Sequence, residues 1–199
     1  MANNILRIIS GDLKGKKVPY LKNANYRPST SKLREAIFSI ISSGEFLEYN
    51  LLLGGKLLDI CSGTGAISFE AISRGMERVT LIDIESSHIK LARETAEEFG
   101  VSDKMSFLRA SATSLPKAQQ CHNLVFIDPP YDKVNKEFIS KILESIISGE
   151  WIENSAIIMI ETDFRRDIED LLKDDLHQKF EIVKVKLYGN SKLSILRYL

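Results

Sequence analysis

Short apolar runs alternate with helix-period segments along the chain from residue 56 onward. Strands are expected at the apolar runs Lys56–Ile60, Arg78–Ile84, Ser106–Arg109, Leu124–Ile127 and Ala156–Glu161. Helices are expected at Ala66–Arg74, Ser86–Phe99, Asn135–Ile147 and Arg165–Lys173. Because each helix carries the chain back to begin the next strand in the same direction, the alternation predicts a parallel sheet with helices on both faces.

Two strand-like runs at the C-terminal end break this alternation. Phe180–Tyr188 and Leu193–Leu199 are joined only by Gly189–Asn190–Ser191, which leaves no room for a crossover helix, so they must pair as an antiparallel hairpin. We therefore expect an α/β fold with a doubly wound, mostly parallel, Rossmann-like sheet of seven strands. The terminal hairpin sets this sheet apart from a plain dinucleotide-binding sheet.

The first 50 residues follow a different pattern. Residues 5–9 and 17–19 are expected to form two short strands around a turn that contains Gly11 and Gly15. Hydroxyl residues at 29–31 then offer helix caps, and apolar residues at helical spacing continue to Ser43. This segment is therefore predicted to be a β-turn-β unit followed by one helix.

The run Leu57–Gly65 places glycines between an expected strand and an expected helix, where the backbone can approach a ligand closely. A dinucleotide site would have a third glycine at position 68, which is Ser68, and no Gly-Lys-Ser/Thr follows for a P-loop. Asp59 at the strand end suits a cationic ammonium group and would repel a pyrophosphate. The motif thus favours S-adenosylmethionine, with a tight turn that holds no ligand as the alternative.

Acidic and small residues end the next two strands. Asp83 lies 24 residues beyond Asp59 and could accept hydrogen bonds from a ribose diol, with a cap of the following helix as the alternative. Ser111 and Ala112 follow the third strand, where small side chains would leave room for an adenine ring. A simple loop explains the last pair equally well.

A buried strand runs into Asp128, Pro129, Pro130 and Tyr131. An amino group on a base is a poor nucleophile because its lone pair is delocalised into the ring. The Asp128 carboxylate, ionised at its ordinary pKa of about 3.9, and a proline carbonyl held by two fixed φ angles could accept its two N–H bonds. Tyr131 could stack on the base, a contact worth roughly 1–3 kcal/mol. A proline-rich turn with a core tyrosine is the alternative.

Basic residues concentrate near the N-terminus, although the formal net charge of the chain is zero. Residues 1–40 contain eight Lys or Arg and two acidic residues, whereas the remainder contains 19 basic and 25 acidic residues. This asymmetry is expected when one segment contacts phosphates, and a solvated terminus is the alternative. The candidate RNA-contacting residues are Arg7, Lys14, Lys16, Lys17, Arg27, Lys32 and Arg34.

Cysteines and histidines do not cluster in the sequence. Cys61 and Cys121 lie 60 positions apart, and His88, His122 and His177 are scattered, so we expect no metal site. No apolar stretch approaches the roughly 20 residues of a membrane span, and the first residues lack the apolar region of a secretion signal. Two isolated cysteines then indicate free thiols in a reducing compartment, so we expect a cytoplasmic protein without a membrane partner.

The pairing of Asp59–Gly65 with Asp128–Tyr131 resembles the class I amino-methyltransferases, which use S-adenosylmethionine. The N-terminal signature resembles one branch of them, the bacterial 16S ribosomal RNA guanine-N2 methyltransferase family, RsmD-like. That signature comprises Arg7–Gly11, Lys14–Lys17, Arg27–Thr30 and Leu33–Phe38. The resemblance spans nearly the whole chain, and the N-terminal signature is its specific part.

The resemblance implies methylation of the exocyclic N2 of a guanine in 16S ribosomal RNA, typically guanine 966, with catalysis at Asp128–Tyr131. With the motifs, it gives as candidate cofactor-binding residues Asp59, Cys61, Ser62, Gly63, Gly65, Asp83, Ile84, Ser111 and Ala112. Cys61 stands where the family often has Ala or Gly. Ser111 stands where it often has an amide or acid, so the adenine contact stays open.

We accordingly expect an RNA-contacting extension over residues 1–50 and an S-adenosylmethionine-dependent methyltransferase domain over 51–199. The expected partner is 16S rRNA or an assembling small ribosomal subunit, bound by a monomer. A DNA adenine or cytosine amino-methyltransferase is one alternative, because it would share the Asp128–Tyr131 chemistry. Only 62 residues separate Gly65 from Asp128, so no target-recognition domain fits there, and recognition by the N-terminal segment suits a structured RNA.

A non-catalytic RNA-binding or assembly module is the second alternative. Such a protein would need neither the glycine motif that ends at Gly65 nor the motif that begins at Asp128. Both motifs are intact, which favours an enzyme.

Overall fold

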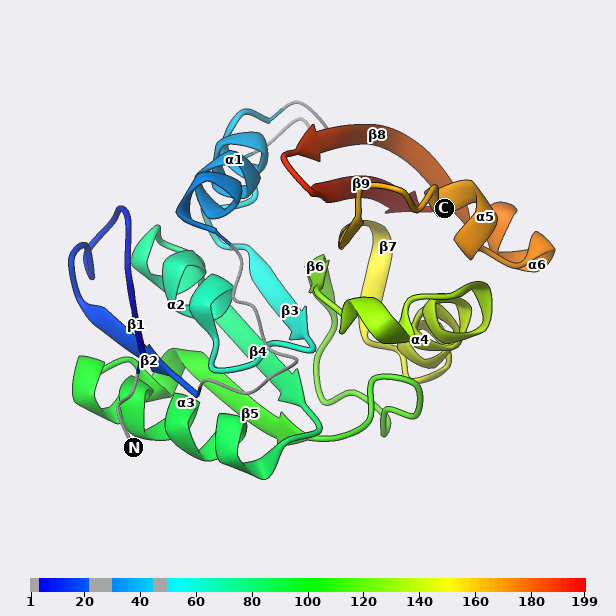
Figure 1. The fold of residues 1–199 in the computed structure, drawn as a ribbon. Coiled ribbons are helices and arrows are strands. Elements are labelled where there is room, and N and C mark those ends of the chain that lie inside the picture. Colours follow the sequence, from blue (N-terminus) through cyan, green and yellow to red (C-terminus); the bar gives the residue numbers. More distant parts are fainter. Residues whose placement is uncertain (1–3, 22–29, 45–49) are drawn as a thin grey trace.

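A seven-stranded sheet forms the middle layer of the fold (Figure 1). The structure is a computed structural model that describes residues 4–21, 30–44 and 50–199. The strands of this sheet are β3 (Lys56–Ile60), β4 (Arg78–Asp83), β5 (Met105–Arg109), β6 (His122–Ile127), β7 (Ile152–Asp163), β8 (Phe180–Tyr188) and β9 (Ser191–Tyr198). Their spatial order is β5-β4-β3-β6-β7-β9-β8, with antiparallel pairing only at β9 and β8. The predicted fold class is confirmed.

Helices cover both faces of this sheet and build two separate apolar cores. On one face lie α1 (Ser31–Ser42), α2 (Ala66–Ser73) and α3 (Ser86–Phe99), and on the other lie α4 (Lys136–Ser148), α5 (Ile168–Leu171) and α6 (Asp174–His177). Two short 3-10 turns, η1 (Ser102–Lys104) and η2 (Tyr131–Lys133), complete the connections. In the part of the chain that the structure describes, no helix combines the length and the apolar character that crossing a bilayer requires.

The helix predicted near Arg165–Lys173 is shorter than expected. Asp163 accepts hydrogen bonds from the backbone N–H and the guanidinium of Arg165, which holds a turn there, and only Ile168–Leu171 is helical. Strand β7 is also longer than expected. Its first half pairs with β6 in a register that differs from that of its second half, and Ser155 in the first half has φ 65°. The exposed polar residues at 153–155 hid that half in the sequence.

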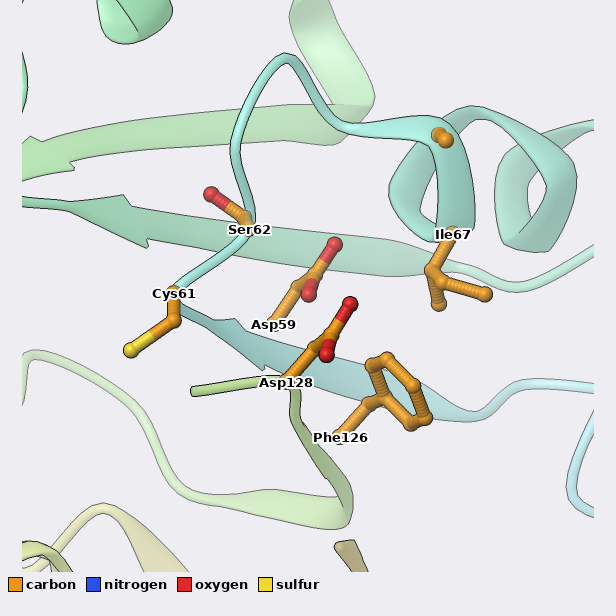
Figure 2. A pocket seen from close by; sticks show the side chains of 7 residues that line it. Asp59, Cys61, Ser62, Ile67, Phe126 and Asp128 are labelled. Atoms are coloured by element: carbon orange, nitrogen blue, oxygen red, sulfur yellow. The ribbon is translucent and has the colours of Figure 1, made fainter. Parts of the chain in front are cut away.

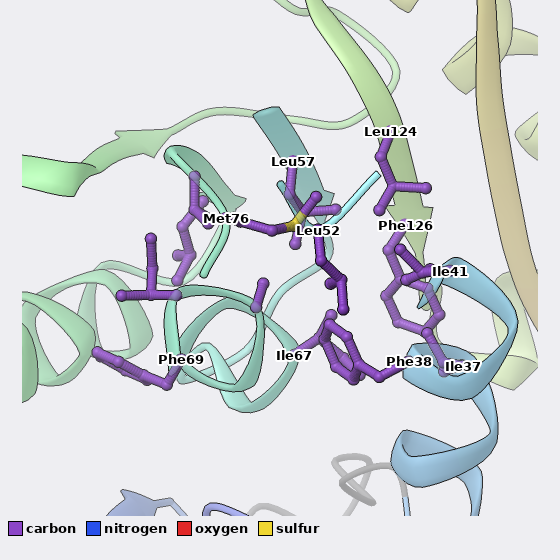
Figure 3. Close-up of a cluster of buried hydrophobic side chains, with 14 of the residues drawn as sticks. Ile37, Phe38, Ile41, Leu52, Leu57, Ile67, Phe69, Met76, Leu124 and Phe126 are labelled. Atoms are coloured by element: carbon purple, nitrogen blue, oxygen red, sulfur yellow. The ribbon is translucent and has the colours of Figure 1, made fainter. Parts of the chain in front are cut away.

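Helix α1 packs into the hydrophobic core on one face of the sheet, although it lies well before β3 in the sequence. Thr30 caps it by accepting the Leu33 N–H, as the sequence suggested. Its apolar side packs near β6, so that Ile37 and Phe38 lie among the same buried side chains as Phe126 (Figure 3).

The N-terminal hairpin, β1 (Asn4–Arg7) with β2 (Lys17–Tyr20), is held to α2 by buried polar contacts. The carboxylate of Glu70, fully buried on α2, accepts the backbone N–H groups of Ile9 (2.9 Å) and Ser10 (3.1 Å) and the guanidinium of Arg74 (2.8 Å). Ser73 accepts the N–H of Leu13. The division at residue 50 therefore stays a prediction about function, because the packing of the described residues is continuous across it.

The hairpin turn approaches α2 closely at one of its two glycines. We therefore expect substitutions of these two glycines to differ in their effect on stability. Gly11 (φ +82°) and Gly15 (φ +84°) are both left-handed, but a Cβ on Gly11 would lie 1.7 Å from the Ser73 carbonyl oxygen, whereas one on Gly15 would meet nothing within 4 Å. We expect Gly15→Ala to cost about 1–2 kcal/mol from backbone strain alone. Gly11→Ala should cost clearly more, because the hairpin must also move away from α2.

Urea denaturation of both variants measures this difference. Equal losses in the free energy of unfolding would show that the hairpin is not packed on α2 as described.

Candidate active site

The two sequence motifs meet because β3 and β6 are neighbours. Asp59 pairs with Phe126 across the two parallel strands, and the backbone N–H of Asp128 donates to the Ile60 carbonyl at 3.2 Å. The chain winds from β3 toward β5 on one side and from β6 toward β8 on the other, so this pair is the point at which the strand order reverses. Open α/β sheets bind ligands at the carboxyl ends of strands at such a point.

A small pocket, open to solvent, lies over these strand ends. Figure 2 shows the Asp59 and Asp128 carboxylates pointing into the same space from adjacent strands. The pocket is lined by Asp59, Cys61, Ser62, Ala66, Ile67, Phe126 and Asp128. Four of these were predicted site residues. The apolar members, Ala66, Ile67 and Phe126, were missed, since their sequence pattern is that of ordinary core residues.

Asp59 is buried, and burial raises the pKa of its carboxyl to about 7, against a smaller opposing effect of hydrogen bonds from Ser68. The Ser68 hydroxyl donates to the Asp59 carboxylate at 2.6 Å. Ser68 occupies the position where a dinucleotide site would carry its third glycine, so the departure from that pattern supplies a partner for the acid. Nearby Asp83 raises the pKa further.

Asp83 organises the glycine loop. One of its carboxylate oxygens accepts the Gly63 N–H at 2.8 Å, and the other accepts the Glu85 N–H at 2.8 Å and lies 3.3 Å from the ring of His88. A carboxylate has about four lone-pair positions, so Asp83 retains capacity for a further donor such as a ribose hydroxyl. The neighbouring Ile84 is an exposed side chain.

Cys61 adopts a left-handed backbone conformation, φ 58°, which is uncommon for a residue with a Cβ. The turn is held by Ser62, whose N–H and hydroxyl both donate to the Ile82 carbonyl at 3.1 Å. Burial, followed by the charges of Asp83, Asp128 and Asp59, raises the pKa of the Cys61 thiol well above its usual range. The thiol is therefore a neutral wall of the pocket, with three carboxyl groups close enough to raise its pKa.

The segment Asp128–Tyr131 leaves β6 as an extended turn into η2. Pro129 is buried, and the Pro130 carbonyl accepts the Lys133 N–H at 2.9 Å. Tyr131 is 40% exposed, and its hydroxyl lies 3.1 Å from Glu161 Oε1 and 3.0 Å from Ser191 Oγ. Burial, offset by the Ser191 hydrogen bond and reinforced by the charge of Glu161, raises the pKa of Tyr131 to about 12.

Ser111 and Ala112 do not line this pocket. Both are half-buried in a small turn after β5, in which Ser111 bridges to Ser114 and its hydroxyl lies 3.0 Å from that of Thr113. The structure thus leaves their predicted adenine contact as a prediction.

Most of the candidate RNA-contacting residues that the structure describes lie at the surface, namely Arg7, Lys14, Lys16, Lys17 and Lys32. Arg34 is a correction: its side chain is 1% exposed, and its guanidinium donates to the Arg7 carbonyl at 3.0 Å inside the fold. Its helical neighbours Leu33 and Ile37 are buried too, so the same helix face carries Arg34 inward. Arg27 lies outside the described residues.

Both cysteines are free thiols, and the described residues contain no group of three or more His, Cys, Asp or Glu side chains arranged to hold a metal ion. His122 is a structural residue of the core. Its ring nitrogens lie 3.0 Å from the Trp151 carbonyl and 2.9 Å from the Thr80 hydroxyl, and burial lowers the pKa of the imidazole to about 4.

The fold is shared with solved structures of low sequence similarity. The Escherichia coli protein yhhF superposes with a TM-score of 0.75 at 20% identity, over 98% of both chains. An RNA methyltransferase from Salinibacter ruber, solved with S-adenosyl-L-homocysteine, gives a TM-score of 0.61 at 14% identity, over 86% of this chain and 94% of the other.

Sequence comparison identifies the family. Residues 6–197 match the family described as Conserved hypothetical protein 95. The methylase RP545 of Rickettsia prowazekii, described as uncharacterized, is 34% identical over 98% of each chain. Ribosomal RNA small subunit methyltransferase D of Escherichia coli is 30% identical over 79% of this chain and 75% of its own. The chain therefore belongs to the Conserved hypothetical protein 95 family, in the RsmD-like branch of the class I methyltransferases.

Proposed function

We propose that this protein transfers a methyl group from S-adenosylmethionine to the exocyclic N2 of a guanine in 16S ribosomal RNA, the family's typical guanine 966. It would act as a cytoplasmic monomer on the RNA or on an assembling small subunit. The single observation that carries the proposal is the shared pocket of Asp59 and Asp128, one acid from each motif. The similarity to ribosomal RNA small subunit methyltransferase D supports the choice of RNA.

The residues of the first motif fit this cofactor. When bound, S-adenosylmethionine supplies an electrophilic methyl group on a cationic sulfonium. The charges of Asp59, Asp83 and Asp128 all raise the pKa of the Cys61 thiol. A site surrounded by these carboxylates favours a cation. Asp59 would hold the ammonium group and Asp83 a ribose hydroxyl. The Thr64 hydroxyl, buried in the same loop and without a partner among the described residues, adds an unused polar group.

Asp128 and a proline carbonyl would orient the target amine. The Pro130 carbonyl accepts the Lys133 N–H and keeps a second lone pair, so the carbonyl of either Pro129 or Pro130 could be the second acceptor. Two acceptors on the two N–H bonds would fix the direction of the nitrogen lone pair, and the gain is one of proximity and orientation. Asp128 acts as an acceptor and not as a strong base, because the amine becomes acidic only after it gains its fourth bond.

The exposed cations of the N-terminal hairpin favour RNA over the alternatives. Arg7 and Lys17 pair across the hairpin, and Lys14 and Lys16 lie in and after its turn. This hairpin is fixed to α2, so its charges hold a set position relative to the pocket. A DNA amino-methyltransferase or a non-catalytic RNA-binding module remains as a competing outcome of the assay below.

Methyl transfer from tritiated S-adenosylmethionine to RNA, DNA and small subunits, followed by nucleoside analysis, tests the proposal. We expect N2-methylguanosine from RNA or subunits and no methylated DNA base. Methylated adenine or cytosine in DNA would establish the first alternative. RNA binding without transfer to any substrate would establish the second.

In the same assay we expect Asp128→Ala and Asp128→Asn to reduce kcat by about 10²–10³-fold, the effect of removing one preorganised hydrogen-bonding group. The asparagine keeps one acceptor but turns the other into a donor. Asp132→Ala is the matched control, since it removes an exposed acid of the adjacent turn η2. Near-normal turnover in Asp128→Ala would exclude the mechanism.

The raised pKa of Asp59 predicts a pH-dependent affinity for S-adenosylhomocysteine. Ammonium binding needs the ionised carboxylate, so affinity should be near its maximum at pH 8, fall to roughly half at pH 7 and reach about one-tenth of the pH 8 value at pH 6. Calorimetry measures this, with 5′-methylthioadenosine, which lacks the amino acid, as a ligand that should show no such change. Asp59→Asn should bind weakly and without this dependence; a retained dependence would assign it to another group.

The hairpin cations should supply RNA affinity without chemistry. Lys14→Ala and Lys17→Ala should each weaken RNA binding and flatten its salt slope by roughly 0.7–0.9 per lost phosphate contact. Lys141→Ala, which removes an exposed cation from α4 on the other face of the sheet, is the control. Binding of 16S RNA titrated against salt gives the slopes, and identical slopes in all variants would remove the hairpin from the RNA interface.

A further inference from the structure

A carboxylate that belongs to neither motif contacts the hydroxyl group of Tyr131 in the second motif. Glu161 lies near the end of β7 and is 4% exposed. One of its oxygens, Oε1, lies 3.1 Å from the Tyr131 hydroxyl and 2.9 Å from the Ser191 hydroxyl, which also lie 3.0 Å from each other. The two hydroxyl groups carry one proton each and the carboxylate only accepts, so two of these three short contacts are hydrogen bonds at any one time.

These three side chains join segments that are distant in sequence. Tyr131 begins η2 after β6, Glu161 belongs to β7, and Ser191 is the first residue of β9, beside the turn of the terminal hairpin. Glu161 and Ser191 are 30 and 60 residues from Tyr131, so their proximity depends on the order β6-β7-β9 in the sheet. The antiparallel end of the sheet thus supplies contacts to the candidate active site.

A buried carboxylate is costly unless it is hydrogen-bonded, and this one accepts from groups at the edge of the site. The ring of Tyr131, meanwhile, stands in a one-turn 3-10 segment and is partly exposed. A ring in that setting would lose rotational freedom when a base stacks on it, and this loss opposes binding. Fixing its hydroxyl in advance removes most of that cost.

We propose that Glu161 and Ser191 are positioning residues that hold the Tyr131 ring, through its hydroxyl, in the orientation in which the target base stacks on it. The inference rests on the proposed function and deepens it. Neither residue touches the reacting atoms. A purely structural role for Glu161 would instead destabilise the β7–β9 pairing whether or not Tyr131 has a hydroxyl.

A double-mutant cycle separates these roles. We expect Glu161→Ala and Ser191→Ala each to lower kcat/KM for RNA about tenfold, and Tyr131→Phe to do the same because the ring loses its anchor. In the Tyr131→Phe background, Glu161→Ala should cost less than a further twofold. Glu161→Gln, which keeps an acceptor, should restore most of the activity, and affinity for S-adenosylhomocysteine should stay within twofold throughout.

Ser194→Ala is the matched control, because it removes a buried serine hydroxyl from the same strand, β9, away from Tyr131. It should leave kcat/KM unchanged. Equal losses from Glu161→Ala in both backgrounds, or no loss in either, would overturn the proposal.

A second measurement does not depend on activity. In protein labelled with ¹³C at the tyrosine ring, the Tyr131 signal is assigned by its absence in Tyr131→Phe. Burial is the main cause of the raised pKa of Tyr131, and the charge of Glu161 adds to it, so Glu161→Gln should lower that pKa from about 12 by part of the shift. An unchanged titration would show that the contact does not hold the ring. If the wild type methylated no RNA, the proposed function would fail, and this titration would still decide whether Glu161 anchors Tyr131.

Discussion

The parallel pairing of β3 with β6 is the constraint on which the rest of the site depends. These strands are adjacent in space, but the chain forms two further strands and two helices between them. The hydrogen bonds between β3 and β6 continue to the backbone N–H of Asp128, which donates to the Ile60 carbonyl. The second motif therefore begins beside the end of β3, where the glycine loop of the first motif starts. A change in the register of this pair would separate Asp59 from Asp128 and remove the pocket between them.

Two buried glutamates connect the N-terminal and C-terminal hairpins to the central elements of the fold. Glu70 on α2 receives the backbone of the N-terminal hairpin, and Glu161 on β7 receives hydroxyl groups from the second motif and the C-terminal hairpin. A buried carboxylate is costly unless hydrogen-bond donors surround it. The donors to each glutamate come from a peripheral element, and these hydrogen bonds fix the position of that element. The hairpin cations and the Tyr131 ring are thereby placed relative to the same sheet.

Periodicity and motif spacing were enough to predict the sheet, its terminal hairpin and the acids of the pocket, because strand ends in a parallel sheet gather at one edge. They failed where a side chain's role depends on distant partners. Glu70 and Glu161 look like ordinary charged residues in the sequence, and only the tertiary packing buries them. Arg34 was predicted to contact RNA because it belongs to the basic N-terminal segment, yet its side chain is buried and its guanidinium donates to the Arg7 carbonyl. Charge pattern alone does not distinguish these cases.

The contacts of Glu70 also set an order of events during synthesis. Ile9 and Ser10 leave the ribosome about sixty residues before their acceptor does, so the N-terminal hairpin emerges without the groups that will satisfy its backbone. It can dock only after α2 has been translated and has formed against the nascent sheet. The hairpin is therefore translated well before it can reach its final place, and a nascent chain that stalls before α2 would leave the basic hairpin without its Glu70 acceptor.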